Sequence, residues 1–154
     1  MTGSDQGQLL VCYDGSEDAK RAIARAGELF LSKRALVLTV WQPAAGLGSF
    51  AWTGAIGGVA DFTELDRAAR EINNQLAREG VGVAQEAGLQ AEPLAEESAG
   101  PVWQTIVQVA EDHDAAVIVM GSRGLTGLRS GLMGSVSTAV VHHTHRPTLI
   151  VRGG

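Results

Sequence analysis

Five short apolar runs alternate along the chain with longer, more polar segments. Most of these runs are continuous rather than alternating, which is typical of strands that are buried on both faces of a sheet. The third run is the least apolar, and Pro93 inside it favours an edge strand, because proline cannot donate a hydrogen bond to a neighbouring strand. The pattern predicts strands over residues 8–13, 35–41, 89–97, 115–120 and 147–152.

The segments between these runs carry apolar residues at helical spacing. Ser16 is placed to cap the first helix, and acidic residues follow it where the positive end of a helix dipole favours them. Asp61 and Glu64 resemble a capping box at the start of the second helix, whose end the glycines at 80 and 82 leave open. We expect helices over residues 17–31, from 61 to either 80 or 88, from 101 to 110 and from 134 to 141.

Strands that alternate with helices predict an α/β fold with a mainly parallel five-stranded sheet and helices on both faces. The length of 154 residues fits one domain, and the sequence contains no internal repeat or linker, so we expect a single domain over residues 1–154. The order of the strands in the sheet does not follow from this pattern.

Composition and charge narrow the class of protein. Hydrophobic residues make up 45% of the chain and the net charge is −5, with only Lys20 and Lys33 beside ten arginines, so we expect a folded protein that binds neither nucleic acid nor membrane. The apolar runs reach about six or seven residues, against roughly twenty for a membrane helix. Cys12 is the single cysteine, which excludes an intramolecular disulfide and favours a reducing, cytoplasmic location.

Glycines gather after two of the predicted strands. Asp14-Gly15-Ser16 follows the first strand, and Gly121 to Gly124 follows the fourth, with Gly134-Ser135-Val136-Ser137 after nine further residues. In open parallel sheets ligands bind at the carboxyl ends of the strands. If the first and fourth strands are neighbours, both loops line one crevice.

The second of these loops has the features of an anion site. Glycines allow close backbone approach, and the start of the following helix offers unpaired N–H groups and a positive dipole end. Ser135 and Ser137 can add hydroxyl donors, and Arg123 or Arg129 can neutralise charge. The expected anion is phosphate, although neither the P-loop spacing nor the dinucleotide-binding spacing is present.

Taken together, these motifs resemble the universal stress protein family over residues 9–152. The resemblance rests on D-G-S after the first strand, V-M-G-S-R-G after the fourth, the full G-x-x-G-x9-G-S spacing and the terminal R-P-T-L-I-V-R. It implies a Rossmann-like three-layer sandwich of the adenine nucleotide alpha hydrolase type. It also implies that the protein binds ATP at the ends of the first and fourth strands and forms a homodimer through the last strand.

The resemblance also implies roles for individual residues. Asp14 matches the acidic residue that lies near the ribose or a Mg²⁺ ion, and Cys12 and Val40 fall where backbone groups contact the adenine. The phosphate motif and its neighbours correspond to Gly121, Ser122, Arg123, Gly124, Gly134, Ser135, Val136 and Ser137. The Gly-rich segment 42–60 departs from the family pattern and could alter base preference or close over the ligand.

Each signal has a simpler interpretation beside it. A lone Gly-x-x-Gly is usually a turn, and D-G-S alone is a common turn with a helix cap. His142, His143 and His145 are better explained as a solvated helix end than as a metal site, and Cys12 as a buried apolar residue. The complete spacing between a buried strand and a helix favours nucleotide binding over a purely structural loop.

The function expected from these features is that of an ATP-binding regulatory protein in stress response, with no catalytic residue assigned. One alternative is a slow Mg²⁺-dependent ATPase or a phosphoryl or nucleotidyl transferase. Another is a protein that binds a different adenine nucleotide, such as cyclic AMP. We expect Gly121→Val and Gly134→Val each to abolish ATP binding while the helices remain folded.

Overall fold

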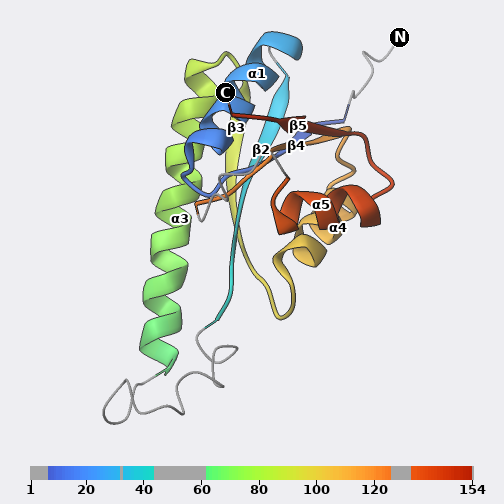
Figure 1. The fold of residues 1–154 in the computed structure, drawn as a ribbon. Helices are drawn as coiled ribbons and strands as arrows, with labels where there is room; N and C mark the ends of the chain where they lie inside the picture. The colour runs from blue at the N-terminus through green and yellow to red at the C-terminus, as the bar shows by residue number, and fades with distance from the viewer. Residues whose placement is uncertain (1–6, 32, 44–61, 126–132, 154) are drawn as a thin grey trace.

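The computed structural model describes residues 7–31, 33–43, 62–125 and 133–153. In these residues five strands alternate with four helices along the chain (Figure 1). The elements are β1 (Leu9–Cys12), α1 (Glu17–Leu29), β2 (Arg34–Trp41), α3 (Phe62–Glu86), β3 (Gln90–Glu97), α4 (Val102–Asp112), β4 (Val117–Gly121), α5 (Ser135–His143) and β5 (Thr148–Val151).

All strand pairs in the sheet are parallel, and the strand order is β3-β2-β1-β4-β5. The central strand β1 places Val11 between Val37 of β2 and Val119 of β4. The α/β fold class predicted from the apolar runs is confirmed. Pro93 lies in the edge strand β3, as its missing N–H donor suggested.

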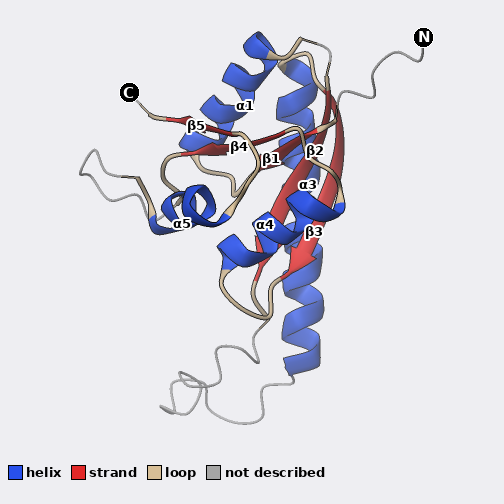
Figure 2. Cartoon of the chain, turned by 90° about the vertical axis from the view of Figure 1, so that its right-hand side faces the viewer, coloured by secondary structure: helices blue, strands red, loops and turns tan. Residues whose placement is uncertain are grey.

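Two layers of helices cover the sheet, α1 and α3 on one face and α4 and α5 on the other (Figure 2). Side chains of one strand alternate between these layers, because successive residues in a strand point to opposite faces. In β1, Leu9 and Val11 pack against α1 and α3, while Leu10 packs on the α4 side. Fully burying such a side chain contributes roughly 1.5–3 kcal/mol.

The ends of the first two helices test the local predictions. Ser16 caps α1 as predicted, with its Oγ accepting a hydrogen bond of 3.1 Å from the N–H of Ala19. Helix α3 continues through Gly80 and ends at Glu86. A Cβ atom at position 80 would lie 2.7 Å from the side chains of Tyr13 and Val37, so this glycine lets α3 approach the sheet closely and does not end the helix.

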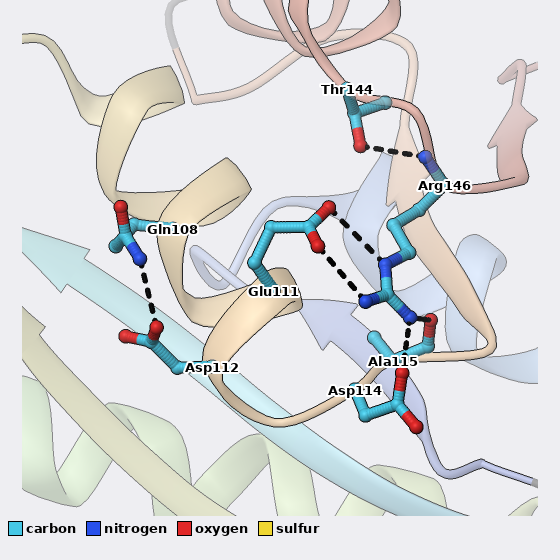
Figure 3. A network of polar contacts seen from close by, with 7 residues as sticks. All are labelled: Gln108, Glu111, Asp112, Asp114, Ala115, Thr144 and Arg146. Atoms are coloured by element: carbon cyan, nitrogen blue, oxygen red, sulfur yellow. Dashed lines mark hydrogen bonds and ion pairs between the residues drawn. The ribbon is translucent and has the colours of Figure 1, made fainter.

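Arg146 ties the chain before β5 to the turn between α4 and β4 (Figure 3). Its guanidinium donates to both carboxylate oxygens of Glu111, at 3.2 and 2.9 Å. It also donates to Asp114 at 2.6 Å and to the carbonyl oxygen of Ala115 at 2.9 Å. Such a two-pronged contact fixes geometry better than a single ion pair.

The Arg146 contact predicts a pH-dependent stability. Hydrogen bonding from Arg146 lowers the pKa of the Glu111 carboxyl below its ordinary value of 4.5. A carboxyl whose pKa is lower in the folded state adds stability above its unfolded pKa and loses it as the pH falls through the lowered pKa. We therefore expect Glu111→Gln to lower the free energy of unfolding in urea at pH 7, with a difference from the wild type that shrinks towards pH 3.

Glu86 provides the control for this prediction. It also lies in the last turn of a helix, and within the described residues it has no ion pair. Glu86→Gln should not reproduce the pH-dependent loss. A Glu111→Gln difference that is the same at pH 7 and pH 3 would contradict the contribution of the ion pair.

Candidate functional site

A cleft of about 200 Å³ lies at the carboxyl ends of β1 and β4. These strands are neighbours, which is the condition under which both glycine-containing loops share one crevice. All of the residues to which the family resemblance gives a role in the nucleotide site line this cleft: Cys12, Asp14, Val40, Gly121, Ser122, Arg123, Gly124, Gly134, Ser135, Val136 and Ser137.

Seven further residues line the cleft, and apart from Ser16, which belongs to the predicted loop after β1, none was assigned to the cleft from the sequence. They are Tyr13, Ser16, Ala19, Leu38, Val102, Ile106 and Met120. Leu38 could have been found from the sequence, because it lies two residues before Val40 in the same strand and therefore faces the same side. Val102 and Ile106 come from α4, whose position over the sheet follows only from the strand order.

One end of the cleft is apolar. Val40, Met120 and Cys12 lie at the strand ends and pack in the same cluster as Val102 and Ile106 of α4. Burial, with a smaller effect from the charge of Asp14, raises the pKa of the Cys12 thiol to about 12. The thiol is therefore protonated at neutral pH, and the half-buried Cys12 forms an apolar part of the cleft wall.

The turn after β1 brings a carboxylate to the cleft. Asp14 Oδ1 accepts a hydrogen bond of 2.9 Å from the N–H of Ser16, which fixes the turn into α1. A Cβ atom at Gly124 would lie 2.8 Å from Asp14 Oδ2, so the two loops approach each other here. The half-exposed Asp14 can contact a ligand that lies between the loops.

The start of α5 supplies backbone donors. The cap residue Gly134 contributes no side-chain hydrogen bond, and its own N–H donates to the carbonyl oxygen of Ser122 at 2.6 Å. Within the described residues, the N–H groups of Ser135, Val136 and Ser137 have no acceptor. Three free donors at the positive end of a helix dipole form an anion-binding arrangement.

Two side chains that line the cleft also contact neighbouring parts of the protein. The hydroxyl of Ser137, expected as a possible ligand donor, is buried and donates to Ser122 at 2.9 Å and to Gly134 at 3.0 Å. Arg123 forms an ion pair with Asp18 at 3.5 Å. Arg129, the other arginine considered from the sequence, lies outside the described residues.

Gly121 has a packing role that the sequence did not reveal. A Cβ atom at this position would lie 2.8 Å from the carbonyl carbon and the Cβ of Asp18, in the first turn of α1. The clash expected on substitution is therefore with α1 and not with a ligand. From the sequence we expected Gly121→Val to abolish ATP binding while the helices remain folded. The structure instead predicts that this substitution destabilises the fold.

The histidines of α5 lie at an exposed helix end, as the sequence suggested. His143 stacks on Trp103 of α4, with ring centroids 4.1 Å apart and an interplanar angle of 14°. No group of three or more potential metal-ligating side chains occurs among the described residues. The Gly-rich segment 42–60 was expected to alter base preference or to close over the ligand. Residues 44–60 of this segment, and Asp61 of the expected capping box, lie outside the described part of the chain.

Comparison with known proteins identifies the family. The model of the Universal stress protein family matches residues 7–152. The chain belongs to this family. It is similar to the universal stress protein YxiE of Bacillus subtilis, with 30% identity over 94% of this chain and 98% of the relative. It is also similar to the universal stress protein of Thermus aquaticus, with 33% identity over 94% of this chain and 97% of the relative.

Solved structures share the fold of this family member. The structure of the protein MJ0577 from Methanocaldococcus jannaschii has a TM-score of 0.74 at 22% identity and covers 97% of both chains. A universal stress protein in complex with cAMP has a TM-score of 0.60, and the Archaeoglobus fulgidus protein in complex with dAMP has a TM-score of 0.58. In the described residues of this family member, no helix has the length and apolar character required to cross a membrane.

Proposed function

We propose that this universal stress protein binds ATP in the cleft and acts as a nucleotide-dependent regulatory protein in stress response. The observation that carries the proposal is the set of three N–H donors at the start of α5, without acceptors in the described residues, beside an apolar pocket. Two solved structures of the same fold are complexes with the adenine nucleotides cAMP and dAMP. They support adenine as the base that this cleft binds.

The cleft offers a different chemistry for each part of ATP. The apolar end around Val40 and Met120 suits a flat purine, beside the strand end that carries Cys12. The N–H groups of residues 135–137 suit the phosphates. Asp14, which lines the same cleft, suits the ribose hydroxyls or a metal ion.

A Mg²⁺ ion fits this arrangement as a companion of the phosphates. Magnesium is usually held by one or two carboxylates together with phosphate oxygens and water, rather than by a full protein cage. Asp14 supplies one such carboxylate, and its Oδ2 lies towards the loop of Gly124. Bound Mg²⁺ would offset the negative charge of the phosphates. Arg123 offsets less of it, because its positive charge is already paired with Asp18.

The nucleotide class can be tested on the purified protein. Heat extraction identifies any nucleotide that remains bound, and calorimetry compares ATP, ADP, cyclic AMP, adenosine and GTP. We expect ATP to bind more tightly than adenosine and GTP. Equal affinity for ATP and GTP would contradict an adenine pocket, and release of ADP with turnover in the presence of Mg²⁺ would favour the ATPase alternative.

The role proposed for Asp14 predicts a metal-dependent loss. Asp14→Ala removes the carboxylate that would join Mg²⁺ to the cleft, so ATP affinity should fall roughly tenfold in Mg²⁺ and much less in EDTA. Calorimetric titrations under both conditions measure the difference. A loss of equal size with and without Mg²⁺ would reject the metal role and leave Asp14 as a contact to the ribose.

We also propose a cytoplasmic homodimer that pairs through β5. This strand lies at the edge of the sheet and its residues are half-buried, so one side of its backbone is open to a second strand. Sedimentation over a range of concentrations tests the dimer. A monomer at all concentrations, including in the presence of ATP, would contradict it.

A further inference from the structure

Asp18 is a buried carboxylate that joins three segments of the chain. It lies in the first turn of α1, and its side chain is only 9% exposed. Oδ1 accepts a hydrogen bond from Arg21 at 3.2 Å, while Oδ2 accepts one from the hydroxyl of Ser122 at 3.3 Å and pairs with Arg123 at 3.5 Å. Burying a charge is costly unless such partners surround it.

Ser122 connects Asp18 to the start of α5, at the anion-binding end of the cleft. Its hydroxyl donates to Asp18 and its N–H donates to the carbonyl oxygen of Val151 in β5 at 2.9 Å. Its carbonyl oxygen accepts from the N–H of Gly134 at 2.6 Å and from the hydroxyl of Ser137 at 2.9 Å. The position of the start of α5 thus depends on Ser122, and Ser122 is held by Asp18.

The packing around Asp18 leaves little room for adjustment. At Gly121 the end of β4 meets the backbone of Asp18 so closely that a Cβ would lie 2.9 Å from its carbonyl oxygen. At Gly153, beyond β5, a Cβ would lie 2.6 Å from Nη1 of Arg21 and 3.2 Å from Nη2 of Arg123. The carboxylate is therefore enclosed by α1, the loop after β4 and the C-terminal segment.

We propose that Asp18 is a positioning residue of the nucleotide site, which orients the N–H groups at the start of α5 through Ser122 and holds the guanidinium of Arg123 beside the cleft. The proposal rests on the function proposed above and concerns the phosphate end of the ligand. Asp18 does not line the cleft, so it acts on the ligand through its neighbours. Residues that orient a binding group in this way change affinity by roughly 10–100-fold in metal sites.

The test compares ATP with adenosine in two Asp18 variants. Asp18→Asn keeps an acceptor for Ser122 but removes the charge that pairs with Arg123, and Asp18→Ala removes both contacts. We expect ATP affinity to fall about tenfold in the first variant and further in the second, while adenosine affinity stays within about twofold. Glu17→Gln removes an exposed charge from the same helix turn and is the control that should change neither affinity.

The outcomes separate this proposal from the proposed function. A wild type that binds no nucleotide overturns both. If the wild type binds ATP and both Asp18 variants bind it equally tightly, only the role of Asp18 is overturned. The same holds if the variants lose ATP and adenosine affinity in parallel with a lowered Tm. If the Asp18 variants do not fold, Ser122→Ala removes one contact, and unchanged ATP affinity in that variant overturns the proposal.

Discussion

Replacing Ser135 with glutamate is expected to abolish ATP binding while the protein stays folded. Ser135 is the first residue of α5, and it is exposed and lines the cleft. A carboxylate there would place a negative charge beside the N–H groups proposed to hold the phosphates. Juxtaposed like charges cost several kcal/mol, so we expect a loss of affinity of roughly 100-fold or more.

The fold itself should tolerate Ser135→Glu. A negative charge in the first turn of a helix is favourable by about 0.3–1 kcal/mol, and α5 has no acidic residue in its first turn. Thermal unfolding should therefore give an equal or slightly higher Tm. Ser135→Gln has nearly the same shape without the charge and should retain most of the affinity. Full ATP affinity in Ser135→Glu would place the phosphates elsewhere.

Gly121→Val is expected to destabilise the whole protein rather than to remove only the ligand. The added Cβ would lie 2.8 Å from the carbonyl carbon of Asp18, and backbone in the first turn of α1 cannot rotate away as a flexible side chain would. Overpacking of this kind typically costs 1–3 kcal/mol and occasionally more, and two further methyl groups enlarge the clash. We expect a loss of roughly 3 kcal/mol or more in the free energy of unfolding.

Gly82→Val is the matched control for Gly121→Val. It introduces the same side chain in α3 at a position where, apart from the backbone of the helix itself and the adjoining residues, no atom of the described residues lies within 4 Å of the added Cβ. Urea unfolding followed by circular dichroism should show little change for this variant. If Gly121→Val were as stable as the wild type and lost only ATP affinity, the clash with α1 would be wrong and the glycine would face the ligand.

The order of the elements could be predicted because the sheet is buried on both faces. A strand such as β4, with Ile118, Val119 and Met120 all buried, is a short continuous apolar run followed by glycine, which is typical of a strand buried on both faces. The end of α3 could not be predicted, because Gly80 breaks the helical pattern locally. A glycine is needed at this position because α3 packs closely on Tyr13 and Val37, which are distant in sequence.

The cleft residues in the two loops could be predicted because spacing and chain direction define them. Asp14, Gly124 and Gly134 follow strand ends or precede a helix, and these positions are visible in the sequence. Asp18 could not be recognised in the same way, because an acidic residue in a first helical turn is common and its partner Ser122 is 104 residues away. Long-range contacts of this kind depend on the strand order, which the sequence pattern left open.

A crystal structure of the protein grown with ATP and Mg²⁺ tests the central claim most directly. We predict that phosphate oxygens lie about 2.7–3.2 Å from the backbone nitrogens of Ser135, Val136 and Ser137, with the adenine ring against Val40 and Met120. A nucleotide bound at another surface, or a cleft that remains empty at saturating ATP, would contradict the account.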